Sequence, residues 1–501
     1  MLKIRIEFYF VMMMLVSCWI IFFTGAPVWG KSLGILLYLV AISYTVAGLW
    51  LQNRPAPKTL LWTCILLFMP VVGYIFYVYS GQLLFKKGSL FNSKRVSDRQ
   101  LFETLRKGEP VLEAPDMLND RQRNFTSYLD RVTLTSQNQN TRTKILKNGE
   151  ETFLEMKRVL MEAKDFIHLE YYIFRYDRLG QELIDILTDK VKEGVEVRLI
   201  YDAFGSASLS ERDSRKIAES GIQLQPFLPL KWGWFTQKFN FRNHRKIIVV
   251  DGKIGFVGGL NVGVEYLGED NRYGFWCDTH VLLEGEAVQT LHAVFLVDWK
   301  YACGDKLFED SRYLQAVQAD GDGLVHVVAT GPETRDMSDH FYAMISCATE
   351  SIWIASPYFI PNQAIMTALR VAAKKGIQVR LMVPESNDGF LTQYATQSYF
   401  PELLRAGIEL YMYQKGFLHK KVIIVDGDMA TIGTANIDLR SFHLNFEVNL
   451  FLTGTASIHD LVTYYEEDLN ESRRIRPVEF YKRNLGVKWK ESFARLFSGM
   501  L

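Results

Sequence analysis

The chain has 501 residues, and its 57 Lys and Arg residues nearly balance its 56 Asp and Glu residues. This length predicts more than one domain, and a net charge near zero argues against a general nucleic-acid binder, which is usually basic. The five cysteines form no close-spaced pair and no metal-ligand pattern. We therefore expect free thiols, no metal site and no cofactor.

The first 84 residues contain three apolar runs, at residues 8–24, 33–51 and 60–80. A helix needs about 20 apolar residues to cross a bilayer, so the second and third runs are long enough and the first is slightly short. We expect residues 1–84 to form a membrane anchor of transmembrane helices. Two alternatives stay open: the first run could be a secretory signal peptide, and the third, with Pro70 and Gly73, could enter and leave on one side.

The basic residues outside these runs set the expected topology. With three spans, Lys31 shares a side with Lys86, Lys87, Lys94 and Arg95, and that side carries slightly more positive charge than the other. Because positive charge collects on the cytoplasmic side of a membrane, we expect the large C-terminal part to face the cytoplasm.

Residues 85–140 are polar and irregular with helical patches, which predicts a linker leading into the folded part. Helical and strand patterns then alternate, with a strand over 166–174, a helix over 180–194 and a strand over 195–201. This βαβ rhythm is typical of parallel strands in an α/β layer fold.

The later part of the chain repeats this pattern. Residues 375–382 match 193–200 in composition and order, and a strand expected at 351–360 matches the one at 166–174. We therefore expect two similar α/β domains related by internal duplication. They would span residues 141–315 and 316–484, followed by a C-terminal amphipathic helix over 485–501.

One motif occurs once in each half. His, Lys, Asp, Gly and Asn recur at the same offsets, first as His244, Lys246, Asp251, Gly258 and Asn261, then as His419, Lys421, Asp426, Gly433 and Asn436. A β-branched run follows each Lys, and Asp-Gly closes it, which predicts a buried strand and a tight hairpin. His and Lys share one face of that strand, whereas Arg245 and Lys420 point the other way.

Two imidazoles, two ammonium groups and two amides suit phosphoryl transfer. A phosphodiester needs a nucleophile, an acid for the leaving alkoxide and positive charge on its non-bridging oxygens. Two histidines can divide the first two roles, and the lysines and asparagines can hold the oxygens without a metal. The alternative, two hairpins with surface His and Lys, gives no reason for Gly and Asn to recur.

Both stretches reproduce the His-x-Lys-(x)4-Asp motif in full, and here the chain resembles the phospholipase D superfamily. Within it, residues 169–174, 328–332, 356–361 and the apolar segment 59–77 resemble bacterial cardiolipin synthases. The resemblance implies two domains about a pseudo-twofold axis with both histidines in one cleft. It also implies an enzyme of the bacterial cell membrane that transfers a phosphatidyl group between two phosphatidylglycerols, through a phosphatidyl-histidine.

The motif residues receive roles in this scheme. We assign His244 as nucleophile and His419 as general acid and base, although the symmetry of the sequence leaves the exchange of roles open. Lys246, Lys421, Asn261 and Asn436 are expected to hold the phosphate oxygens. Asp251 and Asp426 belong to the catalytic motif, but their place at the hairpin turns favours a structural role.

Each histidine also needs a carboxylate to orient its second ring nitrogen. Superfamily members place one downstream of the motif, and Asp278 and Glu447 follow the two motifs at comparable distances. We expect these two to orient the histidines, the alternative being ordinary surface carboxylates.

Two further segments point to an anionic membrane surface as a partner. Residues 226–246 interleave aromatic with basic residues and contain no Asp or Glu, which suits anionic lipid, stacked nucleic-acid bases or simple core packing. The helix over 485–501 carries Leu485, Trp489, Phe493 and Leu496 on one face and could lie on the bilayer or dock on the domain.

Three other functions compete with the transferase. Hydrolysis to phosphatidic acid differs only in the acceptor, and no residue pattern separates it from transfer. A nuclease of the same superfamily is disfavoured by the apolar anchor and the charge balance. A non-catalytic membrane scaffold is disfavoured because both motifs are complete.

Overall fold

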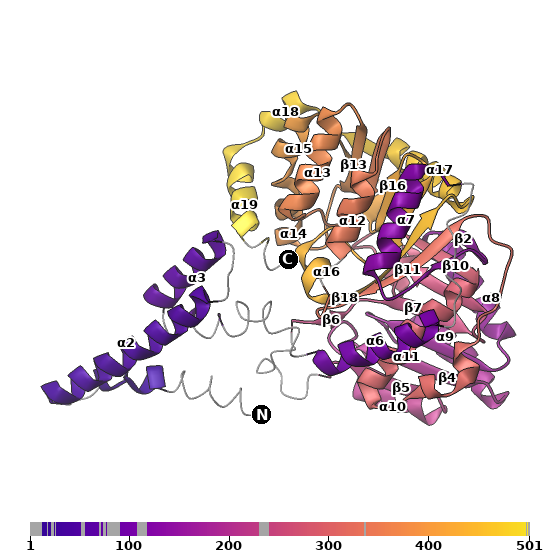
Figure 1. The fold of residues 1–501 in the computed structure, drawn as a ribbon, viewed down its shortest axis with the longest axis horizontal. Coiled ribbons are helices and arrows are strands. Elements are labelled where there is room, and N and C mark those ends of the chain that lie inside the picture. The colour runs from indigo at the N-terminus through magenta and orange to yellow at the C-terminus, as the bar shows by residue number, and fades with distance from the viewer. Residues whose placement is uncertain are drawn as a thin grey trace. The chain divides into compact units, whose positions relative to one another are not determined.

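The computed structural model describes residues 13–17, 19–21, 25, 27–51, 56–69, 72–73, 77, 91–107, 118–229, 240–334, 337–496 and 498 (Figure 1). They belong to an N-terminal unit, up to Phe91, and a larger unit that begins at Asn92. The larger unit holds both copies of the His-x-Lys motif.

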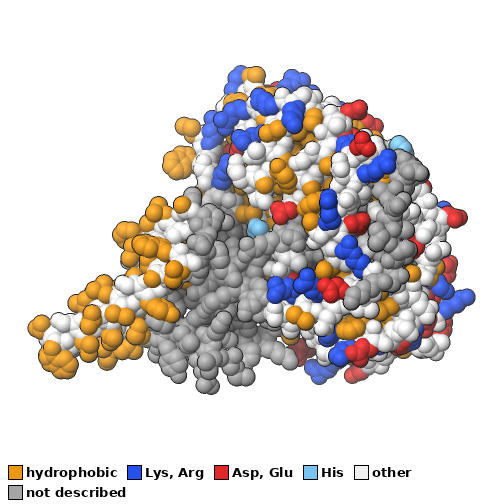
Figure 2. Space-filling view, viewed as in Figure 1, with side chains coloured by type: hydrophobic (Ala, Val, Ile, Leu, Met, Phe, Trp, Pro, Cys, Tyr) orange, Lys and Arg blue, Asp and Glu red, His pale blue; other side chains and the backbone are white. Residues whose placement is uncertain are grey.

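The N-terminal unit is built around two apolar helices, α2 (Val28–Trp50) and α3 (Ala56–Phe68). Trp50 Nε1 donates to Thr63 Oγ1 over 3.2 Å and joins the two. At 23 residues α2 is about 35 Å long. Among the described residues it is the one helix long and apolar enough to cross a membrane. Hydrophobic side chains cover the visible surface of both helices (Figure 2).

Of the three spans expected from the sequence, the described residues contain one helix of spanning length, α2. The second apolar run lies on α2 and its C-cap Leu51. The start of the third run lies on α3, which has 13 residues and ends two residues before Pro70, and most of residues 70–80 lie outside the described residues. Proline lacks the N–H that an α-helix needs, which agrees with an end there. Most of the first run, residues 8–24, lies outside the described residues.

The first half of the larger unit contains a seven-stranded sheet of order β2-β10-β8-β7-β3-β4-β5. The strands β3, β4 and β5, at one end of this order, are parallel to one another, and every other neighbouring pair is antiparallel. The strands are β2 (Thr141–Lys147), β3 (Phe166–Tyr171), β4 (Glu196–Asp202), β5 (Gln223–Phe227), β7 (Lys246–Val250), β8 (Ile254–Gly258) and β10 (Thr279–Gly285).

The second half repeats this order. Its sheet runs β1-β11-β18-β17-β16-β12-β13-β14-β19, and the seven strands between the two edges correspond one by one to those of the first sheet. They are β1 (Gln137–Asn138), β11 (Leu324–Thr330), β12 (Ser351–Ala355), β13 (Gln378–Pro384), β14 (Glu409–Tyr413), β16 (Val422–Val425), β17 (Met429–Gly433), β18 (Asn445–Thr453) and β19 (Ser472–Arg474).

Helices pack on these sheets and close two separate apolar cores. In α9 the carboxylate of Asp177 caps the first turn, and Leu183, Ile184 and Leu187 are buried at helical spacing. The α-helices are α8 (Asn148–Glu162), α9 (Arg178–Lys192), α10 (Glu211–Glu219), α11 (Glu286–Cys303), α12 (Met337–Ser346), α13 (Gln363–Lys374), α14 (Phe390–Gln397), α15 (Phe400–Ala406), α16 (Leu439–His443), α17 (Ser457–Asn470) and α18 (Pro477–Tyr481). Short 3-10 helices are η3 (Val264–Leu267), η4 (Leu307–Glu309) and η5 (Ser311–Leu314).

The two halves exchange short strands where they meet. From the first half, β6 (Arg242–Asn243) pairs in parallel with β18 of the second half. From the second half, β15 (Gly416–Leu418) pairs in parallel with β9 (Phe275–Cys277) of the first half. Figure 1 shows β6 and β18 at the boundary between the magenta first half and the orange to yellow second half. Each exchanged strand leads directly into a motif histidine.

The segment expected to be a linker is folded where it is described. It contains α6 (Asn92–Lys107) and α7 (Asp120–Val132). Phe125 and Leu129 of α7 are buried in the core of the second half, and Lys94 of α6 lies 3.0 Å from Asp298 of α11. Residues 85–140 are therefore partly an element of the larger unit, since their apolar side chains complete its core.

The C-terminal helix α19 (Leu485–Leu496) docks on the domain, one of the two alternatives left open by the sequence. It does so with its less apolar face: Ala494 is buried in the second core, and buried Glu491 pairs with Arg483. The expected apolar face is turned outward, with Trp489 76% and Leu496 80% exposed. The middle of the basic-aromatic segment, residues 230–239, lies outside the described residues, and Phe227 and Phe241, at its described ends, are buried.

Candidate active site

A cavity of about 490 Å³ lies between the two halves and is lined by both motif histidines. Asn261 and Asn436 also line it, so four of the predicted site residues reach one space. The exchanged strands explain this convergence, because each places a histidine at the seam between the halves.

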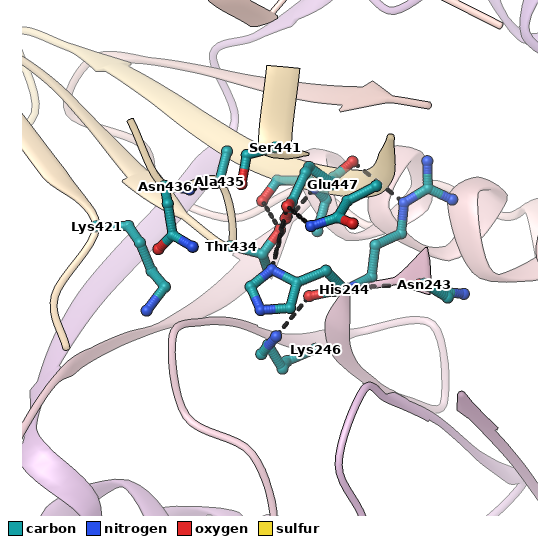
Figure 3. Close-up of polar contacts among 12 residues, drawn as sticks. Asn243, His244, Lys246, Lys421, Thr434, Ala435, Asn436, Ser441 and Glu447 are labelled. Atoms are coloured by element: carbon teal, nitrogen blue, oxygen red, sulfur yellow. Dashed lines mark hydrogen bonds and ion pairs between the residues drawn. The ribbon is translucent and has the colours of Figure 1, made fainter. Parts of the chain in front are cut away.

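His244 follows β6 and is held by the second half. Its backbone N–H donates to Phe446 O over 2.9 Å, and its Nδ1 lies 3.0 and 3.1 Å from the two carboxylate oxygens of Glu447 (Figure 3). Nδ1 donates its proton to this carboxylate, since a carboxylate only accepts. The lone pair then resides on Nε2, the atom available to substrate.

His419 repeats the arrangement in the opposite direction. Its backbone N–H donates to Cys277 O over 2.7 Å, and its Nδ1 lies 2.7 Å from Oδ2 of Asp278. Asp278 belongs to the first half and Glu447 to the second. Each histidine is therefore oriented by the carboxylate of the other half, a crossed pairing that the spacing along the chain did not indicate.

Residues that sequence reasoning missed support the two carboxylates. Thr434 Oγ1 donates to Glu447 Oε2 over 2.6 Å, and Asn445 Nδ2 donates to Oε1 over 3.1 Å. Asp278 accepts from the backbone N–H of Thr279 over 2.8 Å. A Cβ at Gly259 would stand 2.0 Å from Oδ1 of Asp278, so only glycine fits there. In the sequence, the feature that could have predicted this support is the small size of residues between the motif Gly and Asn, such as Gly259 and Thr434.

The motif lysines lie beneath the histidines and are buried. Lys246 Nζ donates to His244 O over 2.6 Å, and Lys421 Nζ lies 2.5 Å from His419 O and 2.9 Å from His419 Nε2. Figure 3 shows Lys421 and Asn436 of the second half beside His244 of the first. Burial lowers the pKa of Lys421 to about 8 and that of Lys246 well below its usual range.

Burial also decides the protonation of the histidines. It lowers the pKa of His244 to about 4, against the opposing charge of Glu447, and the pKa of His419 to about 3, where Lys421 adds to the effect. Both rings are therefore neutral near pH 7, as a nucleophile or a general base must be.

The orienting carboxylates remain charged in the same surroundings. Burial acts to raise their pKa values, but Lys421 and His419 hold the pKa of Asp278 below its usual range. His244 and Lys246 do the same for the pKa of Glu447. The two carboxylates and the two lysines thus lie close together, buried next to the histidines.

The two motif asparagines differ in their contacts. Asn261 accepts from the backbone N–H of Ile173 over 3.1 Å and donates to the Tyr266 hydroxyl over 3.0 Å. The backbone N–H of Asn436 donates to Ser441 Oγ over 3.1 Å, whereas its side-chain Oδ1 is buried and has no protein partner among the described residues. The amide of Asn261 is thus fixed by the protein before any substrate binds.

Asp251 and Asp426 are not among the residues that line the cavity, which fits the structural role favoured by their place at the hairpin turns. They lie at the far ends of β7 and β16, at a φ of 52° in both turns. Asp251 accepts from the backbone N–H of Lys164, Asp165 and Phe166 over 2.8–2.9 Å. Asp426 binds the corresponding backbone before β12 over 2.7–2.8 Å. They fix the central strands.

The residue between His and Lys points to the opposite face of the strand, as expected. Arg245 forms a buried ion pair with Asp298 of α11, and Lys420 forms one with Asp468 of α17. Each pair ties the motif strand to the helix that follows its sheet. Removing one partner would leave a buried charge, so these residues hold the site in place rather than contact the cavity.

Comparison with known proteins identifies relatives of the whole chain. A family model described as "Cardiolipin synthase, PLD-like domain" matches residues 156–299 and 341–470. A probable cardiolipin synthase of Bacillus subtilis (strain 168) is 51% identical over 504 residues, covering 100% of both proteins. A cardiolipin synthase of Geobacillus sp. (strain WCH70) is 45% identical, covering 94% of this chain and 95% of that protein.

A solved structure shares the fold. The phosphatidylserine synthase of Haemophilus influenzae Rd KW20 superposes with a TM-score of 0.58, covering 77% of this chain and 100% of that protein. At 14% identity this similarity establishes the arrangement of strands and helices alone.

Proposed function

This chain belongs to the cardiolipin synthase family of phospholipase D-like phosphatidyltransferases, and from that membership we propose how its own residues carry the reaction. Two phosphatidylglycerols are converted to cardiolipin and glycerol in the cavity between the halves. The observation that carries this proposal is the pair of neutral histidines at one cavity, each held by an ionised carboxylate.

In the first step Nε2 of His244 attacks the phosphorus of the donor lipid. The P–N bond forms and the bond from phosphorus to the headgroup glycerol oxygen breaks, while His419 supplies the proton that this oxygen takes up. A neutral His419 cannot supply this proton, because its Nε2 carries none. The negative charge of a bound phosphodiester raises the pKa of a nearby histidine and so opposes the effect of burial. Substrate binding thereby favours the protonated form of His419, which can act as the acid.

In the second step the proton and the phosphatidyl group move in reverse order. His419, now neutral, removes a proton from a hydroxyl of the second phosphatidylglycerol, and the resulting oxygen attacks the phosphatidyl-histidine. The P–N bond breaks, His244 returns to its neutral form and cardiolipin leaves. Splitting the displacement into two steps lets one pair of histidines serve both. Exchange of the two roles gives the same products.

The cations beneath the histidines stabilise the charge that develops on phosphorus. Lys246 and Lys421, with the amides of Asn261 and Asn436, hold the non-bridging oxygens in this scheme. Lys421 Nζ is 2.9 Å from His419 Nε2 in the free protein. A phosphate oxygen that takes over this contact frees the ring to exchange its proton. Because the lysines supply the positive charge, we propose that no metal ion is required.

The membrane setting forms the second part of the proposal. α2 crosses the bacterial cell membrane, the segment that includes α3 provides a further span, and the catalytic unit faces the cytoplasm. The outward apolar face of α19, with Leu485, Trp489 and Phe493, is flanked by Lys488 and Lys490. An exposed apolar stripe beside positive charge suits an anionic lipid surface. We also propose that the equal strand order of the two sheets reflects internal duplication.

The experiment that tests the reaction is lipid analysis after incubation of the purified protein with phosphatidylglycerol liposomes. Cardiolipin and an equal amount of glycerol, both absent with His244→Ala, are the expected result. Phosphatidic acid as the main product would replace transfer by hydrolysis. Absence of any product would overturn the proposal.

A further inference from the structure

Three acidic residues, Glu265, Asp388 and Asp438, line the cavity. Glu265 is paired with Arg175, and Asp438 caps α16 by accepting from the backbone N–H of Ser441 over 2.7 Å. Asp388 differs from both, because its side chain is exposed and forms no ion pair within the part of the chain that the structure describes. A carboxylate without a cation repels the anionic substrate of the proposed reaction, so its place in the cavity wall calls for a different partner.

The side chain of Asp388 is paired with a hydroxyl group. Tyr358 also lines the cavity, and its hydroxyl donates to Asp388 Oδ2 over 2.6 Å. Because a carboxylate only accepts, the proton comes from the tyrosine, and the tyrosine oxygen keeps lone pairs that can accept in turn. Oδ1 of Asp388 is an acceptor as well. Two hydrogen-bond acceptors therefore lie side by side in the cavity wall.

The loop that carries Asp388 is fixed to the strand end that carries Tyr358. Asn387 Nδ2 donates to Pro357 O over 3.0 Å, and Asn387 Oδ1 accepts from the backbone N–H of Asp388 over 2.9 Å. One asparagine thus connects the neighbours of both groups. The two acceptors are positioned before a ligand binds, so that binding requires little further ordering.

The first half has no counterpart of this hydroxyl at the matching position. Tyr358 and Ile173 each directly precede a phenylalanine that forms an isolated bridge to the residue after the motif asparagine. An isoleucine side chain forms no hydrogen bond. The motif residues repeat in the two halves, but the hydrogen-bonding group at this position belongs to the second half alone.

The charge of Asp388 acts on the side of the cavity that holds His419. Burial lowers the pKa of Lys421, and nearby carboxylates, Asp388 among them, oppose this effect. Lys421 Nζ in turn lies 2.9 Å from His419 Nε2. In the proposed scheme His419 protonates the departing glycerol and later deprotonates the attacking hydroxyl. Both glycerol groups therefore react on the side where Tyr358 and Asp388 lie.

We propose that Tyr358 and Asp388 bind the free hydroxyl groups of glycerol, an inference that rests on the proposed function. The glycerol that leaves the donor and the glycerol of the acceptor lipid both keep a hydroxyl on the middle carbon while a terminal oxygen reacts. A carboxylate repels phosphate but accepts from a hydroxyl, and the tyrosine oxygen offers a second acceptor. These contacts orient the terminal oxygen toward His419 and favour a polyol over water.

The test compares two acceptors that differ by one hydroxyl. Purified protein in phosphatidylglycerol liposomes receives equal concentrations of radiolabelled glycerol and of trimethylene glycol, which is glycerol without its middle hydroxyl. Either acceptor takes the phosphatidyl group through a terminal oxygen and releases one unlabelled glycerol from the donor. The ratio of labelled phosphatidylglycerol to phosphatidyl-trimethylene glycol measures recognition of the middle hydroxyl and does not depend on the amount of folded protein.

Wild-type protein should prefer glycerol by about tenfold, the effect of one charge-assisted hydrogen bond. Asp388→Ala removes the charged acceptor and should lower this preference to about twofold or less. Asp388→Asn keeps a neutral acceptor and should give an intermediate ratio. Tyr358→Phe keeps the ring and the carboxylate but loses the hydroxyl oxygen, so its ratio should also be intermediate.

The matched control is Asp460→Ala on α17, which removes an exposed carboxylate outside the cavity lining and should leave the ratio unchanged. An unchanged preference in Asp388→Ala or in Tyr358→Phe would overturn the inference, as would wild-type protein without a preference for glycerol. Wild-type protein that transfers to neither acceptor and forms no cardiolipin would refute the proposed function itself. The two failures are therefore distinguishable.

Discussion

The half-sites around His244 and His419 are built on one plan but are not copies. In each, a short strand crosses to the other half, and the histidine that follows is bound by a carboxylate there. Glu447 accepts from two side chains, Thr434 and Asn445, whereas Asp278 accepts from the backbone of Thr279 and, over 3.4 Å, from the Trp276 indole N–H, and the absence of a side chain at Gly259 leaves room for it. The repeated pairing suits the proposed scheme, in which both histidines serve one reaction, and the different surroundings suit the different steps proposed for them.

The largest expected effect comes from removing either histidine. His244→Ala and His419→Ala should each lower cardiolipin formation by at least about 10³-fold, because nucleophile and acid act as one unit. Initial rates with liposomes measure this. Comparable loss in both variants would show that the halves are equally needed, and near wild-type activity in either would refute the two-histidine scheme.

Removing the charge of the carboxylate that orients each histidine tests the two half-sites separately. Glu447→Gln and Asp278→Asn keep the size of each side chain but cannot stabilise a charged ring, so a loss of about 10²- to 10⁴-fold is expected. Because the pairing is crossed, Glu447→Gln should slow the appearance of phosphatidyl label on His244 in a single turnover. Normal labelling in this variant would contradict the pairing.

Because the two carboxylates are supported differently, substitutions next to Asp278 and next to Glu447 should lower activity by unequal amounts. Gly259→Ala places a methyl group 2.0 Å from the Asp278 carboxylate and must displace it from His419, so we expect a loss of at least about 10²-fold. Thr434→Ala removes one hydrogen bond to Glu447 and should cost less than about tenfold. Cardiolipin formation by both, compared at equal folded protein, tests this. Equal losses would remove the distinction between the half-sites.

The smallest expected effect is on stability against pH. The folded pKa of His419 lies near 3, below the ordinary 6.5, so below about pH 6.5 the unfolded state binds more protons and the folded state loses stability. At pH 5.5 this amounts to about 1 kcal/mol. His419→Gln cannot titrate, so its melting temperature in detergent should fall about 1–2 °C less than wild type between pH 7.5 and 5.5. An equal fall would contradict it.

The repeated motif and the α/β character could be predicted from the sequence because both depend on short-range spacing. Period-two and period-3.6 patterns indicate strands and helices, and His244 and Lys246 share a strand face wherever that strand lies. Local pattern also suggested a structural role for Asp251 and Asp426, since an Asp-Gly turn can be recognised without knowing the partner strand.

Only the tertiary structure decided which groups meet. The crossed carboxylates depend on strands exchanged between the halves. The role of α7 in the second core and the outward apolar face of α19 were decided in the same way. Composition and periodicity describe one element at a time, whereas the crossed carboxylate contacts join residues 203 and 141 positions apart, whose pairing is set by how the two sheets pack together.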